Sequence, residues 1–411
     1  MTGFGAHGAM RGVLGEDLTP EGMLRLGSAL AGEGLVGLGC SNTPAARMLG
    51  RAAAVGVAAA GGTAVTHAMD CPVQGAWAAA RREWPISLFI EEGEQACFLH
   101  LFDRQGLHLE RERERELEAR LERAEVGRVG SREVGELRRT ALSPRQWAED
   151  TVTGLSLGRP ALRRVAAAVE GDSPEDQAVR EVLLALGCHL EEAWRPGIPA
   201  FRADRGGYRL TLRDERGALM EPGQVLSLLA LIEMENGGGK VAVPSGASAG
   251  VDVVAAGYNG TVLRLDRDGQ SARDLYAALP WLWSAPAAAG RICARMGVSG
   301  QRLESLAAKT PRFHTWRREV PLEGDRSRIL ELLAGEAGNA QRGEGLRLRA
   351  GSGWVYLSPA RRHTLRVVAE DADMETAAEL CDFFAGRAAA LDRKLLGENA
   401  HSEDKNRPFS S

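Results

Sequence analysis

The chain has 411 residues, of which 44% are hydrophobic and 26% charged, and its formal net charge is −4. This length predicts two to four domains, because a single hydrophobic core rarely grows so large. The slightly negative charge and the 5% aromatic content offer neither the basic face nor the stacking surfaces of a nucleic-acid-binding protein.

No stretch has the uninterrupted apolar length of about 18 residues that a membrane span requires. The first residues form no apolar segment of a signal peptide, so we expect a cytoplasmic protein with no membrane partner. The six cysteines are scattered and form no Cys-x-x-Cys pair, which fits neither a zinc site nor a disulfide framework. We therefore expect reduced thiols that behave as small hydrophobic side chains.

Helices and strands alternate through the first part of the chain. Helix-start signals with proline and glycine stops predict three helices, over residues 18–31, 43–60 and 73–83. Short apolar runs between them predict three buried strands, over residues 35–38, 63–67 and 86–90. Strands separated by helices of this length indicate a parallel α/β sheet.

Residues 110–125 alternate Glu and Arg, with Leu117 and Leu121 at helical spacing. The segment is too short for several heptads of a partner-binding coiled coil. We expect an amphipathic helix with a solvated face that closes the first domain.

A second α/β unit follows. Its predicted strands are residues 162–169, 188–190, 208–212, 240–243 and 261–265, and its predicted helices are residues 175–186 and 224–235. The last part differs, because three predicted strands (346–349, 354–357 and 365–370) precede one closing helix (374–391), which is an α+β pattern. The residues after about 397 are polar, and we expect them to be disordered.

Several segments resemble the motifs of the α-D-phosphohexomutases in order and spacing. Residues 4–12 (FGAHGAMRG), followed by LTPE at 18–21, are similar to the F-G-T-D-G-I-R-G opening of that family. Residues 102–107 (FDRQGL) resemble its F-D-P-D-G-L segment, and residues 210–229 resemble the stretch after its metal loop. The chain is identified as a degenerate member of this superfamily, similar to phosphoglucosamine mutase and phosphomannomutase.

The resemblance implies three α/β domains with mixed sheets plus a C-terminal α+β domain around a central cleft. The expected boundaries are 1–135 (phosphoserine-loop domain), 150–222 (metal-loop domain), 223–322 (sugar-loop domain) and 323–395 (phosphate-loop domain), with a disordered tail at 396–411.

The family's reaction uses a phosphoserine in a T-A-S-H-N-P loop, which donates its phosphoryl group to a sugar phosphate. Counting back from Phe102 without a gap aligns residues 88–93 (LFIEEG) with this loop and places Ile90 at the serine. An alkyl side chain cannot carry phosphate, so we predict no catalytic residue. Ser87 comes closer only with a shifted register, and it lacks the His-Asn neighbours.

The family's metal loop, D-G-D-x-D-R, aligns with residues 204–209 (DRGGYR), where only Asp204 of three carboxylates remains. Mg²⁺ requires several anionic oxygens, so we predict no metal site and no cofactor, and we expect Asp204 to pair with Arg205. The nearby Asp214 and Glu215 lie in a predicted turn, and we expect them on the surface.

The family's terminal R-P-S-G-T-E-P loop aligns with residues 358–364 (SPARRHT). By the resemblance, the phosphate-binding residues would be Arg11, Ser358, Arg361, Arg362 and His363. The arginine forks suit phosphate oxygens, but the segment equally fits a solvated basic turn. Other motifs are lost: the G-R-D-T-R segment has become residues 39–43 (GCSNT), and the sugar-reading loop has no counterpart. The apolar stretch at 274–289, with Trp281 and Trp283, is expected to pack between domains rather than to bind a ligand.

The leading hypothesis is an inactive pseudoenzyme that binds a phosphosugar or a protein partner. The alternative is a divergent active phosphohexomutase, an isomerase of carbohydrate metabolism that acts as an intramolecular phosphotransferase, with Mg²⁺ and with His100 or His7 as phosphoryl acceptor. A third hypothesis is a structural role, as a homodimer or as a heteromer with a true mutase.

Overall fold

The computed structural model describes residues 9–122, 128–155, 165–360 and 363–405. The chain divides into two compact units, Met1–Met220 with Ala277–Glu304, and Glu221–Tyr276 with Ser305–Ser411. Four sheets follow one another along the sequence, and the predicted combination of α/β parts with a C-terminal α+β part is confirmed. Among the described residues, no helix is long and apolar enough to span a membrane.

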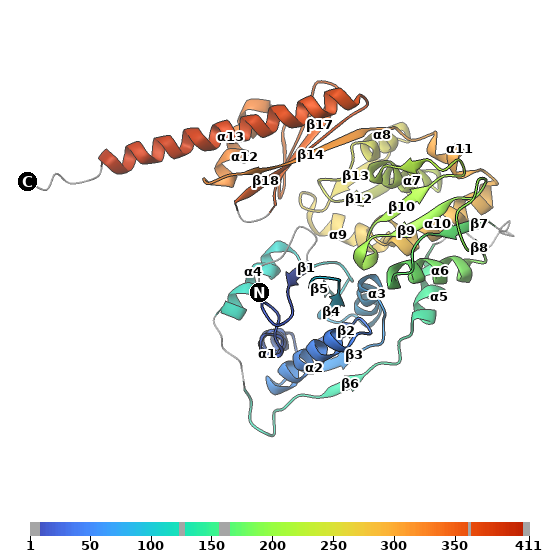
Figure 1. Cartoon of the computed structure of the whole chain (residues 1–411), viewed down its shortest axis with the longest axis vertical. Coiled ribbons are helices and arrows are strands. Elements are labelled where there is room, and N and C mark those ends of the chain that lie inside the picture. The colour runs from blue at the N-terminus through green and yellow to red at the C-terminus, as the bar shows by residue number, and fades with distance from the viewer. Residues whose placement is uncertain (1–8, 123–127, 156–164, 361–362, 406–411) are drawn as a thin grey trace, which may run out of the picture. The chain divides into compact units, whose positions relative to one another are not determined.

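The first sheet is mixed. Its strands are β1 (Ala9–Gly12), β2 (Leu35–Cys40), β3 (Thr63–Thr66), β4 (Ile86–Glu92), β5 (Cys97–Asp103) and β6 (Leu137–Arg139). They lie in the order β1-β5-β4-β2-β3-β6 (Figure 1). Strands β2, β3, β4 and β6 are parallel, whereas β5 runs antiparallel to both β4 and β1. The strand β6 extends this sheet past the expected boundary at residue 135.

Helices cover both faces of the first sheet. They are α1 (Pro20–Leu30), α2 (Pro44–Ala59), α3 (Pro72–Arg82) and α4 (Arg111–Glu122), and the short helix η1 (Ala31–Glu33) follows α1. Thr19 and Thr43 cap α1 and α2, because their side chains accept hydrogen bonds from Gly22 N and Ala46 N. One face packs a core with α1, α2 and α4, and the other packs Phe89 and Phe102 against α3.

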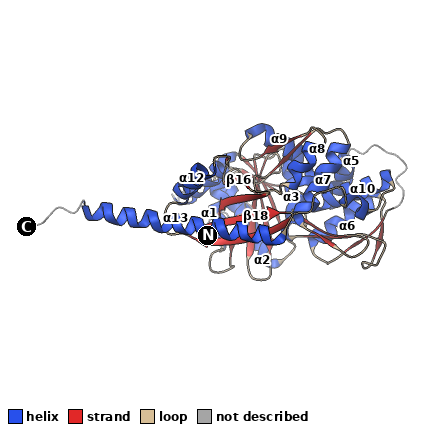
Figure 2. Cartoon of the chain, turned by 90° about the horizontal axis from the view of Figure 1, so that it is seen from above, coloured by secondary structure: helices blue, strands red, loops and turns tan. Residues whose placement is uncertain are grey.

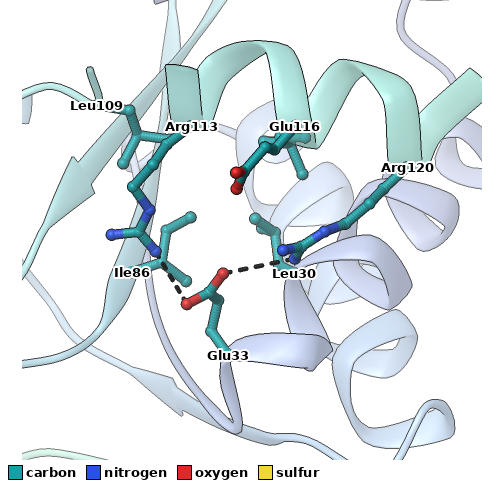
Figure 3. Close-up of a pocket in the computed structure, with 8 residues that line it drawn as sticks. Leu30, Glu33, Ile86, Leu109, Arg113, Glu116 and Arg120 are labelled. Carbon is teal, nitrogen blue, oxygen red and sulfur yellow. Dashed lines mark hydrogen bonds and ion pairs between the residues drawn. The ribbon is translucent and has the colours of Figure 1, made fainter. Parts of the chain in front are cut away.

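Two arginines of helix α4 pair with the carboxylate of Glu33 in η1. Arg113 Nη2 lies 2.9 Å from Glu33 Oε2, and Arg120 Nη1 lies 3.4 Å from Glu33 Oε1 (Figure 3). Leu117 of the same helix is buried in the core below. The Glu/Arg-rich segment is therefore an amphipathic helix packed on the first domain, as predicted.

The second sheet is built from strands of one continuous part of the chain, and a helix from a distant part packs beside it. Its strands are β7 (Ala166–Val169), β8 (His189–Glu191), β9 (Ala200–Ala203), β10 (Leu210–Arg213) and β11 (Leu219–Met220), in the order β11-β10-β9-β7-β8. The neighbouring helices are α5 (Pro144–Gly154), α6 (Pro174–Leu186) and α10 (Ala285–Ser299).

Helix α10 packs on α6, although the sequence places it far downstream. A Cβ atom at Gly290 would lie only 2.9 Å from Val182 Cγ1, so the glycine permits this close approach. Assigning this part of the chain to the 223–322 domain was therefore wrong. The boundary depends on a long-range helix contact that local periodicity does not report.

The second unit contains the remaining two sheets. The parallel pair β12 (Lys240–Val243) and β13 (Thr261–Arg264) packs with α7 (Pro222–Glu235) and α8 (Gly250–Gly257). Helices α9 (Gly269–Ala278) and α11 (Leu303–Ala307) cross the boundaries between the units, and η3 (Pro280–Leu282) belongs to the first unit.

The last sheet is antiparallel throughout. Its strands are β14 (His314–Pro321), β15 (Gln341–Arg342), β16 (Leu346–Ala350), β17 (Gly353–Pro359) and β18 (Thr364–Asp371), in the order β14-β18-β17-β16-β15. Helices α12 (Arg326–Ala337) and α13 (Met374–Lys405) contribute to its core (Figure 2). Strand β14 pairs with β18 along its whole length, so it belongs to this sheet and not to the third domain, where residue 322 was the expected boundary.

The predicted disordered tail is helical over most of its length. Helix α13 continues through Lys405, and Figure 1 shows it extending beyond the strands it covers. Its last turns contain Ala, Glu and Lys and no proline, so a helix that is already nucleated on the sheet can propagate. Residues 406–411 lie outside the described residues.

The contact between α1 and α2 predicts opposite effects for two glycines of α2. A Cβ at Gly56 would lie 2.1 Å from Leu24 O of α1, so Gly56→Ala forces the helices apart and is expected to cost about 1–3 kcal/mol of stability. A Cβ at Gly50 would meet its nearest atom at 3.6 Å, so Gly50→Ala should stabilise by about 0.5–1 kcal/mol. Urea unfolding of both variants checks this, and equal effects would contradict the packing described.

Candidate functional site

The position expected for the phosphoserine lies in the core. Ile90 of β4 pairs with Leu99 of β5, and its side chain is 0% exposed. The two strands remain paired up to Glu92 and Cys97, so a tight hairpin replaces a projecting loop. Ser87, the shifted-register candidate, is also 0% exposed. Neither residue can meet a soluble substrate in this structure.

The opposite face of the same two strands carries polar side chains. Successive strand residues alternate between faces, so Glu91, Phe98 and His100 point away from the core that holds Ile90. Glu91 Oε2 lies 2.9 Å from His100 Nε2, and Tyr208 Oη lies 3.0 Å from His100 Nδ1. Arg205 Nε lies 3.7 Å from Glu91 Oε1. These four residues (Glu91, His100, Arg205 and Tyr208) are called the buried network below, after its buried centre of Glu91 and His100; Arg205 lies at its exposed edge.

Two members of the buried network come from the segment that aligns with the metal loop. It connects β9 to β10 and contains the short helix η2 (Arg205–Gly207). Gly206 and Gly207 have φ values of 81° and 78°, a left-handed conformation that glycine adopts without strain. The loop thereby turns Tyr208 back toward the first sheet.

Asp204 shapes this loop through hydrogen bonds to its backbone. Its Oδ1 accepts hydrogen bonds from Tyr208 N and Arg209 N, both at 2.8 Å. The ion pair of Arg205 goes to Glu91, so the expected Asp204–Arg205 pair was wrong. A carboxylate beside glycines folds an Asx-type turn more readily than it pairs with the next side chain.

Burial controls the protonation of these groups. It raises the pKa of Glu91 to about 7, against the opposing effect of the Arg205 charge. Burial, together with the smaller effect of the nearby Arg205 charge, lowers the pKa of His100 to about 3. Burial also raises the pKa of Asp204 to about 6, although backbone N–H donors oppose the shift. Glu91 and His100 therefore share a single proton below neutral pH.

The donor set does not fit a divalent cation. Gly206 and Tyr208 stand where the resemblance expects the second and third aspartates, and the Asp204 oxygen is occupied by backbone N–H groups. No group of three or more His, Cys, Asp or Glu side chains that could hold a metal occurs in the part of the chain that the structure describes.

The segment predicted to bind phosphate connects β17 to β18. Ser358 is half-buried and pairs with Arg366, and His363 is exposed with a φ of 59°. Arg361 and Arg362 lie outside the described residues. Arg11 is exposed on β1 in the first unit, whereas the hairpin belongs to the second, so a shared phosphate site stays a prediction.

The two tryptophans of the apolar stretch have structural roles. Trp281 is 4% exposed, with Arg291 Cζ 4.2 Å from its ring centre, and Trp283 packs against two core clusters. Packing was therefore the correct prediction.

Glu215 contradicts its predicted surface position. It is 4% exposed, and its carboxylate accepts hydrogen bonds from Leu303 N at 2.6 Å and Glu304 N at 3.0 Å. The sequence shows a turn, but it does not show that a distant segment covers it.

The buried network was not predicted as a unit. Its signal was present, because Glu91 and His100 interrupt apolar strands at positions that share one face. Tyr208 and Arg205 could not be joined to them without the fold.

Comparisons with known proteins support the fold. No family model matches the sequence, and no curated protein matches it. Solved structures do match over almost the whole chain. A phosphoglucomutase/phosphomannomutase family protein from Burkholderia thailandensis is 17% identical, with a TM-score of 0.73, covering 95% of this chain and 98% of its own.

Two further structures agree. A Thermus thermophilus protein described as a phosphomannomutase is 15% identical, with a TM-score of 0.65, covering 97% of this chain and 100% of its own. An N-acetylphosphoglucosamine mutase from Aspergillus fumigatus, solved with GlcNAc-6P and magnesium, is 10% identical, with a TM-score of 0.51, covering 95% and 96%. The chain therefore has the multidomain fold of the phosphohexomutases.

The buried network makes a prediction about stability and pH. Between pH 4.5 and 6.5 the folded pair holds one proton, on Glu91, and the unfolded pair also holds one, on His100. Their joint contribution to the free energy of unfolding therefore does not change with pH in this range. Below pH 4.5 the unfolded pair takes up a second proton, and stability falls by about 2 kcal/mol toward pH 3. Above pH 6.5 the unfolded pair releases its proton first, so stability falls slightly up to pH 7.

The measurement is the free energy of unfolding against pH for the wild type and for a Glu91→Gln/His100→Gln double variant, whose side chains do not titrate. The wild-type minus variant difference should be flat in the middle range and fall on acidification below it. A difference that already falls from pH 6.5 downward would show that Glu91 is ionised in the folded protein.

Proposed function

We propose that this chain is a phosphohexomutase-family protein, similar to phosphoglucosamine mutase and phosphomannomutase, that has lost mutase catalysis and acts by binding a phosphosugar or a protein partner. The observation that supports this most directly is the buried network. Its four side chains bond to one another at the two segments where the family's phosphoserine and metal loops are expected.

The missing nucleophile supports the loss of phosphoryl transfer. The family's chemistry requires a group that accepts and returns a phosphoryl group, and a cation that neutralises its charge. Ile90 has no atom that could accept a phosphoryl group, and it is fully buried. The Oδ1 atom of Asp204 already accepts a hydrogen bond from Tyr208 N in its own loop. Binding, in contrast, needs neither group.

The divergent-mutase alternative requires a histidine acceptor. His100 is 4% exposed, and each of its ring nitrogens already faces a partner, Glu91 or Tyr208. Phosphorylation would have to break one of these contacts and bring a dianion into a buried site. His7 lies outside the described residues. The structure therefore favours the binding hypothesis over this alternative.

For a binding role, we propose two kinds of binding partner. The first is a phosphosugar, held by Arg11 or by the hairpin with Ser358, Arg361, Arg362 and His363. The related Aspergillus fumigatus mutase was solved with GlcNAc-6P, which supports this ligand class. The second is a protein, either another copy of this chain or a true mutase in a heteromer.

The test is a mutase assay on the purified full chain with a hexose 1-phosphate, a glucose 1,6-bisphosphate primer and Mg²⁺. We expect no conversion above a control without protein, and the Burkholderia thailandensis relative serves as the matched reference. Turnover that EDTA abolishes would overturn the proposal, because it would require both a phosphoryl acceptor and a metal site.

A serine at position 90 should not restore activity. Ile90→Ser places a hydroxyl in the core, where it is expected to destabilise the fold by about 2–5 kcal/mol and to remain unphosphorylated. Mass spectrometry after incubation with glucose 1,6-bisphosphate checks this. An Ile90→Ser variant that became phosphorylated at the new hydroxyl and turned over substrate would mean that one substitution alone had inactivated the chain.

A further inference from the structure

Arg205 is held in place on three sides. Its Cζ lies 4.8 Å from the centre of the Phe98 ring, and its Nε faces Glu91 at 3.7 Å. A Cβ at Gly93 would lie 2.6 Å from Nη1, so the guanidinium lies closely against this glycine. An arginine stacked on an aromatic ring and paired on one edge loses little further freedom when it binds a ligand.

The other edge of this guanidinium is available. The Arg205 side chain is 50% exposed. Within the described residues, neither Nη1 nor Nη2 donates a hydrogen bond, and Glu91 lies on the Nε side. Two N–H groups on the terminal nitrogens thus form a fork with the spacing that phosphate and carboxylate oxygens accept.

A second arginine shares the same face of the sheet. Arg11 of β1 pairs directly with Phe98 of β5, so both side chains project from one side of the strands. Arg205 stacks on that same Phe98. Arg11 is exposed, and the resemblance had already suggested it as a phosphate ligand.

We propose that Arg205, held by Phe98 and Glu91 and assisted by Arg11, forms a metal-independent binding site for a phosphate monoester. The inference rests on the proposed phosphosugar-binding function and names the residue that performs it. The guanidinium supplies the positive charge, and the His100–Tyr208 pair keeps Glu91 in position. Phosphate binding therefore requires no Mg²⁺ and leads to no transfer.

The test is isothermal titration of the full chain in EDTA with inorganic phosphate and, separately, with a hexose 6-phosphate. Arg205→Ala should weaken binding of both probes about 10-fold or more, since it removes a charge-assisted fork. Arg205→Lys keeps the charge without the fork and should fall in between. Arg209→Ala removes an exposed arginine from the same loop, and we expect it to bind like the wild type.

The outcomes separate this site from the wider proposal. If the hexose phosphate binds equally to the wild type and Arg205→Ala, the Arg205 site is overturned while phosphosugar binding stands. If inorganic phosphate binds through Arg205 and no hexose phosphate binds, the site stands and the phosphosugar function fails. If neither probe binds, or if binding requires Mg²⁺, the Arg205 site is overturned. Circular dichroism confirms that each variant is folded before titration.

Discussion

The hydrogen bond between Glu91 and His100 is the contact on which the arrangement of the candidate site depends. Two polar side chains from adjacent strands are almost fully buried, and such groups are stable only when each finds a partner. His100 finds its second partner in Tyr208, and Glu91 finds its second in Arg205. The strands of the first sheet thereby become joined to a loop of the second sheet.

These contacts explain why the motif losses occur together. Where the resemblance expects the phosphoserine and metal loops of the phosphohexomutases, this chain has other residues. In this structure, those residues contact one another. By the resemblance, Tyr208 stands at the place of an aspartate and Glu91 at the place of a histidine. The side chains at these positions satisfy one another's hydrogen-bonding groups.

The sequence predicted most of the framework and little of the site. Helices with proline starts and glycine stops, such as α2 and α6, were found within about two residues because their signals are local. The placement of α10 was missed because it depends on packing with α6, more than a hundred positions away. The placement of β14 was missed because it depends on pairing with β18, nearly fifty positions away. Glu215 was misplaced for the same reason, since the segment that covers it is remote. Ile90 was recognised as chemically unsuitable, but only the strand pairing showed that it lies inside the core.

The central claim is that an internal network occupies the place of a phosphoserine and a metal. A crystal structure grown with Mg²⁺ and glucose 1,6-bisphosphate tests it most directly. We expect such a structure to show Ile90 buried in its strand, Arg205 stacked on Phe98 beside Glu91, and no cation at Asp204. A magnesium ion coordinated by several carboxylates beside a phosphorylated serine would contradict it.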